Sequence, residues 1–137
     1  MIIETELNEI ISSSETINVY NDGVVTSYRQ GETSYNQIVE GWKELCENAR
    51  EMPAFGVSLN NETIEARGVG LWVEFVFDLP HTHSNMTFEK LLLKVEKQWQ
   101  GFNIVRYNSQ GGYSGRCFFL DLAGGNMSQF YDILANL

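Results

Sequence analysis

The sequence contains few of the residues that cross-link chains, bind metals or interrupt secondary structure. Its 137 residues include two cysteines and two prolines, and His81 and His83 are the only histidines. Cys46 and Cys117 lie far apart and form no CxxC motif, so we expect two separate buried thiols. A zinc site needs three or four ligands, more than this pair of histidines supplies. We therefore expect neither a metal nor another cofactor.

Long apolar segments and basic residues are equally scarce. No apolar run approaches the roughly 18–20 residues of a membrane span, and the first residues, MIIETE, lack the basic segment of a secretory signal. We therefore expect a cytoplasmic protein that does not insert into membranes. Nine Lys and Arg against 18 Asp and Glu give a net charge of −9. This charge repels phosphates, so we expect no nucleic-acid binding.

The negative charge is concentrated in the first half of the chain. Residues 1–66 contain twelve acidic and three basic residues, whereas residues 67–137 contain six of each. An acidic half of this kind steers a basic protein partner toward itself. The alternative explanation is that the negative charge only keeps the protein soluble, which is the commoner reason for a low isoelectric point.

Length and residue patterns predict one domain, residues 1–137, with several antiparallel strands. Asn21-Asp22-Gly23 between two β-branched runs predicts a hairpin. In the strand at residues 70–79, the odd positions are apolar and Pro80 is expected to end it. Asn60-Asn61 is interpreted as a turn. The other predicted strands cover residues 54–59, 102–107 and 113–122.

Four segments have helical patterns. The clearest runs from about Ser34 to Glu51, with Ser34 to Gln37 as a capping box. Residues 86–100 fit either a helix or a strand, and their Glu, Lys, Leu and Gln content favours a helix. The remaining helices are expected at residues 2–11 and from residue 126 onward. The prediction is therefore an α+β fold: a mostly antiparallel sheet of about six strands, built from hairpin–helix units, with two to four helices packed on it.

The helix over residues 34–51 carries a row of acidic residues. At about 100° per residue, its four glutamates fall within an arc of roughly 60°, opposite the apolar face. Such a row is a candidate docking surface for a basic partner, although it is also compatible with an ordinary solvated helix face. We assign the candidate partner-binding residues as Glu40, Glu44, Glu47 and Glu51, with Asn36 and Asn48 at the rim.

No motif for catalysis is present. The sequence has no G-x-S-x-G elbow, and its glycine-rich segments lack the lysine of a phosphate-binding loop. We therefore assign no catalytic residues. The alternative is a small enzyme or ligand-binding domain with a cleft near Glu74, Asp78, His81 and His83. A purely structural explanation for two of these residues is that Glu74 and Asp78 pair with Arg106 or Arg116 across the sheet.

Charge and missing motifs together favour a non-enzymatic, acidic protein-binding module. An inhibitor or immunity protein that neutralises a basic, nuclease-like partner is of this physical type, because its acidic surface imitates a phosphate backbone. A second alternative is a structural domain that forms a homo-oligomer through its aromatic residues, Trp72, Trp99 and Tyr113.

Overall fold

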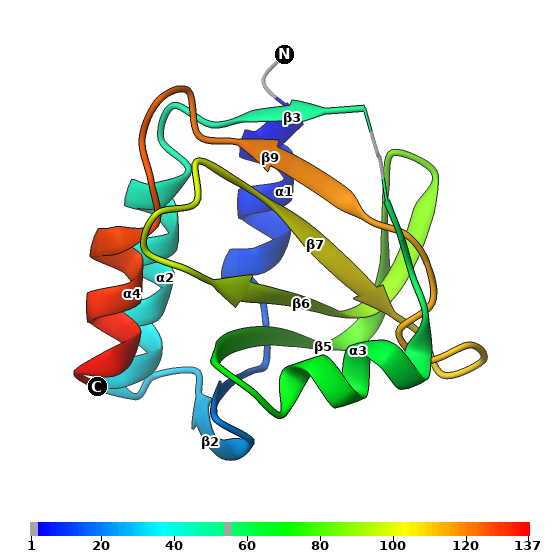
Figure 1. The fold of residues 1–137 in the computed structure, drawn as a ribbon, viewed down its shortest axis with the longest axis horizontal. Coiled ribbons are helices and arrows are strands. Elements are labelled where there is room, and N and C mark those ends of the chain that lie inside the picture. The colour runs from blue at the N-terminus through cyan, green and yellow to red at the C-terminus, as the bar shows by residue number, and fades with distance from the viewer. Residues whose placement is uncertain (1–2, 54–55) are drawn as a thin grey trace.

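The computed structural model describes residues 3–53 and 56–137, in which a strongly curved antiparallel sheet carries helices on both faces (Figure 1). The seven strands of this sheet have the order β2-β1-β5-β6-β7-β9-β3, and a second sheet pairs β4 with β8. This arrangement confirms the predicted α+β fold and its mostly antiparallel sheet. The strands of the main sheet are β1 (Thr16–Asn21), β2 (Val24–Arg29), β3 (Arg50–Met52), β5 (Leu71–His83), β6 (Met86–Val95), β7 (Gly101–Tyr107) and β9 (Phe118–Asp121). The other elements are β4 (Val57–Ser58), β8 (Gly115–Arg116), α1 (Ile3–Ser12), α2 (Thr33–Leu45), α3 (Asn60–Arg67) and α4 (Ser128–Ala135).

The β1–β2 hairpin forms where the sequence predicts it. Asp22 and Gly23 have φ angles of 49° and 86°, the left-handed conformation that a two-residue hairpin turn requires. The Asp22 carboxylate also accepts a hydrogen bond from the backbone N–H of Gly70 at 2.8 Å. This bond connects the turn to the start of β5, the strand that pairs with β1 on the side opposite β2.

The main core lies between one face of the sheet and the helices α1, α2 and α4. Trp42 of α2 is fully buried at its centre, and its ring makes edge contacts with Phe75, Phe102 and Phe130. The Trp42 indole N–H donates to the Asn8 side chain of α1 at 2.8 Å. Trp42 thus connects three helices, α1, α2 and α4, with strands β5 and β7 of the sheet.

A smaller core lies on the opposite face of the sheet, next to α3. It is built from Trp72, Leu92 and Tyr113, with Tyr20, Val105 and Tyr107 packed around them. β5 is therefore buried on both faces, because Val73 and Phe75 belong to the main core.

Residues 86–100 do not form the predicted helix. Residues 86–95 form β6, which pairs with β5 along most of its length and with β7. Leu91 and Leu93 face the main core, while Leu92 faces the smaller one. A strand buried on both faces has a continuous apolar run, which sequence periodicity does not separate from a buried helix. Pairing with two neighbouring strands outweighs the helical propensity of Glu and Lys.

α2 is also shorter than predicted. It begins at Thr33 with Glu32 as the N-cap residue, so the expected capping box at Ser34 is not formed. It ends at Leu45, and the chain turns through Cys46 and Ala49, both of which are buried in the main core. Residues 50–52 then form β3, which pairs with β9 at the edge of the sheet. Residues 50–51, the end of the predicted helix, therefore belong to the sheet, because they pair with β9.

Three other expectations are corrected. Pro80 does not end β5, because a register shift between Val76 and His81 accommodates the proline within a longer strand. Leu79, the last of the apolar odd positions in the predicted strand, is exposed. Residues 60–61 begin α3 instead of a turn. The strand predicted over residues 54–59 is represented by β4, with residues 54–55 outside the described part of the chain.

The central position of Trp42 predicts a large loss of stability when its side chain is removed. Trp42→Ala should lower the free energy of unfolding by about 3–5 kcal/mol, because the cavity left by the missing side chain borders α1, α4 and the sheet. Urea unfolding followed by circular dichroism measures this loss. Trp99→Ala is the matched control, since Trp99 is 40% exposed. Equal losses in the two variants would contradict the central role of Trp42.

Candidate partner-binding groove

A groove of about 660 Å³ runs between α2 and α4. The two helices lie side by side at one end of the molecule (Figure 1). Three acidic side chains line the groove, and no basic residue is among its lining residues in the described part of the chain. The lining residues are Gln37, Glu40, Gly41, Glu44, Ser128, Gln129, Asp132, Ile133 and Asn136.

The floor of the groove depends on the close packing of α4 against Gly41. A Cβ atom at this position would lie 2.7 Å from Ile133 Cδ1 and 3.3 Å from a ring carbon of Phe130. Gly41 therefore permits a closer approach of α4 than a larger residue would. At the rim, the Gln129 amide donates to the Glu44 carboxylate at 2.8 Å and bridges the two helices.

The charge of the groove is only partly compensated. Lys43 lies 3.8 Å from Glu40, and Lys97 lies 3.2 Å from Asp132. Both ion pairs are exposed to solvent, so each contributes little and is screened by salt. Glu44 has a neutral hydrogen-bond partner, Gln129. The groove therefore presents acceptor oxygens and negative charge to an incoming cation.

The structure places the six predicted residues in four different settings, of which Glu51 alone occupies the last. Glu40 and Glu44 line the groove, and Asn48 lines a smaller adjoining pocket of about 210 Å³ that also contains Glu44. Asn36 is exposed on α2 near the groove residue Gln37, and Glu47 is exposed just beyond the end of the helix.

Glu51 does not belong to this acidic surface. It lies in β3, where its side chain is only 8% exposed and its Oε1 is 2.5 Å from His83 Nε2. Its other oxygen accepts a hydrogen bond from the Ser84 hydroxyl. The prediction that Glu51 continues the row of glutamates is wrong, because α2 ends before Glu47 and the chain then enters the sheet.

The acidic groove also contains residues that sequence reasoning missed. Gln129 and Asp132 contribute from α4 and Asn136 from its C-cap position, and the three follow one another at spacings of three and four. That spacing is a sequence signal for a polar helix face. Nothing in the local sequence shows that this face lies beside Glu40 and Glu44, which are about ninety residues earlier in the chain.

Glu74 forms a buried network of its own. Its side chain is 0% exposed. One oxygen accepts from Asn18 at 3.2 Å and from the Tyr20 hydroxyl at 3.0 Å. The other oxygen accepts from the Tyr113 hydroxyl, which in turn accepts from Arg67 of α3 at 2.8 Å. The carboxylate thus accepts three hydrogen bonds, and the network attaches α3 to the sheet.

The network shifts the pKa values of both tyrosines upward. Burial, followed by the charge of Glu74 and the hydrogen bond to it, raises the pKa of Tyr20 to about 12. The same causes raise the pKa of Tyr113 well above its ordinary value. Both hydroxyls therefore remain protonated donors at neutral pH.

The structure places Glu74, Asp78, His81 and His83, the residues of the alternative cleft, in different surroundings. Glu74 lies in the smaller core, whereas His83 contacts Phe118 of the main core and His81 packs against Phe77 and Phe88. Asp78 is exposed. The described residues contain no group of three or more His, Cys, Asp or Glu side chains that could hold a metal ion.

The cross-sheet pairing of Glu74 with Arg106 or Arg116 is also not observed. Arg106 donates instead to the backbone carbonyls of Arg116, at 2.7 Å, and Thr87, at 2.9 Å. The arginine that lies near Glu74 is Arg67, whose guanidinium lies 4.5 Å from the centre of the Tyr20 ring. α3, which was not predicted, brings this residue to the sheet.

The remaining predictions concern the cysteines and the aromatic residues. Cys46 and Cys117 are buried and not disulfide-bonded, as expected, and burial raises the pKa of the Cys117 thiol. Trp72 and Tyr113 are buried in the smaller core, whereas Trp99 is partly exposed. The three aromatic residues therefore do not form the shared self-association surface that the sequence suggested.

The chain matches no family model, and no curated protein or solved structure is significantly similar to it. Among the helices that the structure describes, none is both long and apolar enough to cross a membrane.

The Glu74 network predicts a strong dependence of stability on this carboxylate. Glu74→Ala should lower the free energy of unfolding by at least about 3 kcal/mol, because it leaves the buried Tyr113 hydroxyl and the half-buried donors of Asn18 and Tyr20 without their acceptor. Glu74→Gln should cost less, since the amide retains one acceptor oxygen. Asp78→Ala, an exposed site on the same strand, should change stability by at most about 0.5 kcal/mol. Urea unfolding tests the order, and comparable losses at positions 74 and 78 would refute it.

The raised pKa of Tyr20 predicts a loss of stability at alkaline pH. The unfolded chain releases this proton near the ordinary value of 10, whereas the folded protein holds it until about 12. The stability that the folded protein gains from holding this proton is complete below pH 10 and is lost as the pH rises toward 12. Tyr20→Phe should therefore show a shallower fall in unfolding free energy over this range. An unchanged slope would show that Tyr20 titrates at its ordinary pKa.

Proposed function

We propose that this protein is a non-enzymatic, acidic binding module that docks a basic protein partner in the groove between α2 and α4. The observation that carries the proposal is the convergence of Glu40, Glu44 and Asp132 on one groove without a lining cation. Three carboxylates from two helices attract lysine or arginine side chains of a partner.

The groove has the size and polarity for this task. A volume of about 660 Å³ accommodates several side chains of a partner. Ser128 and Gln129 of α4 and Asn136 at its C-cap add neutral donors and acceptors to the groove. Such groups orient a bound chain, whereas the carboxylates supply the attraction.

The charge distribution supports a partner of strongly basic character. The acidic first half of the chain, which contains α2, creates a field that increases the rate of association with a cationic surface. A nuclease that binds phosphates through Lys and Arg presents such a surface. We propose that the protein is an inhibitor or immunity protein that occupies this surface in the cytoplasm, in place of the nucleic acid.

The proposal predicts that two neutralising substitutions in the groove abolish partner binding. The protein is purified from its own host on an affinity tag, and the bound chains are identified by mass spectrometry at low and high salt. Wild type should retain a basic chain in fixed stoichiometry, and salt should release it. Glu40→Gln with Glu44→Gln should not retain this chain, because the partner loses its attraction to α2.

A matched control separates groove chemistry from net charge. Glu62→Gln with Glu65→Gln changes the net charge equally on the exposed surface of α3 and should retain the partner. Equal loss in both double variants would indicate a general charge effect and contradict the groove. A bare wild-type chain at low salt would contradict the docking proposal as a whole.

A further inference from the structure

A second candidate site surrounds Trp99, away from the acidic groove. Trp99 is 40% exposed, whereas Trp42 and Trp72 are buried. Its side chain lines a first hollow of about 360 Å³ and a second of about 470 Å³, and the two hollows adjoin at Gln98 and Trp99. The described residues that line the acidic groove line neither hollow. An exposed tryptophan between two hollows is typical of a ligand-binding surface.

The first hollow combines aromatic rings with amide side chains. No charged side chain is among the described residues that line it. These residues are Gln98, Trp99, Gln100, Gly101, Phe102, Asn103 and Phe119. Gln98, Gln100 and Asn103 are exposed, and each of their amides carries both hydrogen-bond donors and an acceptor. The hollow is therefore uncharged, partly aromatic and rich in hydrogen-bonding groups.

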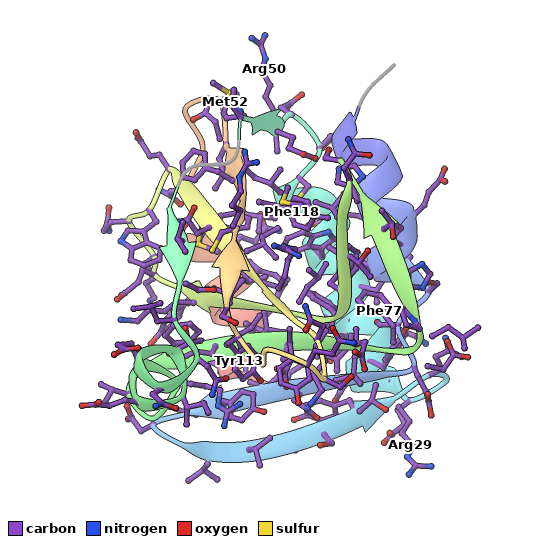
Figure 2. The ribbon with its side chains drawn as sticks, turned by 90° about the vertical axis from the view of Figure 1, so that its right-hand side faces the viewer. Arg29, Arg50, Met52, Phe77, Tyr113 and Phe118 are labelled. Atoms are coloured by element: carbon purple, nitrogen blue, oxygen red, sulfur yellow. The ribbon has the colours of Figure 1, made fainter. Side chains whose placement is uncertain are left out.

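The sheet fixes one side of this hollow. Phe118 of β9 lies among the interior side chains (Figure 2), so the next residue, Phe119, faces the opposite side of the strand. Asn103 of β7 is paired with Phe119 in the register and shares its side of the sheet. A Cβ atom at Gly101 would lie 2.9 Å from Phe119 Cζ. The absence of a side chain at Gly101 therefore lets the Phe119 ring pack against β7.

Trp99 lies in the turn between β6 and β7, on the other side of the hollow. Its backbone N–H donates to the carbonyl of Glu96 at 3.2 Å, and the carbonyl of Gln100 accepts from the N–H of Leu122 at 2.8 Å. The Lys94 ammonium lies over the Trp99 ring, 5.9 Å from its centre, and is 3.0 Å from the Glu96 carboxylate. The turn is thus attached to its neighbours, and Lys94 contacts the ring from one face.

We propose that this surface binds a neutral oligosaccharide. The C–H groups on one face of a sugar ring pack against an aromatic ring, whose face carries partial negative charge. Each sugar hydroxyl is both a donor and an acceptor, and each amide side chain offers both groups in return. The run Gln98-Trp99-Gln100 places an aromatic ring between two such amides. Asn103 adds a third amide from the sheet.

Other ligand classes match the first hollow less well. A phosphate, carboxylate or ammonium group meets no opposite charge among the described residues that line it. The net charge of −9 also repels nucleic acids and other anions. A proline-rich peptide packs on aromatic rings, but it offers mainly carbonyl acceptors, so the oxygens of the three amides stay unmatched. A sugar uses the aromatic face and both halves of each amide.

The second hollow extends the proposed site. Its lining residues are Glu96, Lys97, Gln98, Trp99 and Tyr131. Tyr131 supplies a further aromatic ring, and the two charged residues are already paired, Glu96 with Lys94 and Lys97 with Asp132. Because Gln98 and Trp99 line both hollows, a chain of sugar rings can pass from one hollow to the other across Trp99. We therefore expect an oligosaccharide to bind more tightly than its monosaccharide.

A glycan array tests the proposal with the purified full chain. The array carries neutral oligosaccharides of glucose, galactose, mannose and N-acetylglucosamine, with sialylated and sulfated glycans and a proline-rich peptide beside them. Wild type should bind a neutral oligosaccharide. The same sugar in solution should change the tryptophan fluorescence, because Trp99 is the most exposed of the three tryptophans. Binding to no neutral glycan, or only to the charged glycans or the peptide, overturns the proposal.

Three variants locate the binding surface. Trp99→Ala should weaken binding of this sugar by about tenfold or more, because the packing against the aromatic face is lost. Gln100→Ala should weaken it less, since two other amides remain. Gln110→Ala is the matched control, because it removes an exposed amide that lines neither hollow, and it should bind as wild type does. Circular dichroism confirms the fold of each variant. Unchanged binding by Trp99→Ala, or an equal loss in Gln110→Ala, overturns the proposed site.

Discussion

β5 lies between two layers of side chains. Val73 and Phe75 face α1, α2 and α4, and the neighbouring residues Trp72 and Glu74 face the smaller core beside α3. A strand buried on both sides requires cover on both sides, so helices are placed on each face of the sheet. Glu74 is the one charged residue in this strand that is fully buried, and its three donors arrive from β1 and from the segment before β8.

The proposed groove follows from what these layers leave uncovered. α2 and α4 bury their apolar faces in the main core and present their polar faces to solvent, side by side, which produces the acidic groove. The helices do not extend over the whole sheet. β2 is consequently left with an exposed side.

The candidate site was predictable from the sequence only in part. Glu40 and Glu44 were found because helical spacing is a local property, and both lie within the part of α2 that forms. Glu51 was misplaced because the pairing of β3 with β9 joins residues about seventy positions apart. Asp132 was missed for a similar reason, since its proximity to Glu40 results from the packing of α4 against Gly41.

The sequence by itself determined the α+β class, the β1–β2 hairpin, the buried thiols and the excess of acidic charge. Each of these depends on composition or on neighbouring residues, such as the left-handed turn at Asp22 and Gly23. Only the tertiary structure decided that residues 86–95 are a strand, that Glu74 is bound by Tyr20 and Tyr113, and that Glu51 pairs with His83. These outcomes depend on contacts between distant segments, whose burial and hydrogen bonding outweigh local propensity.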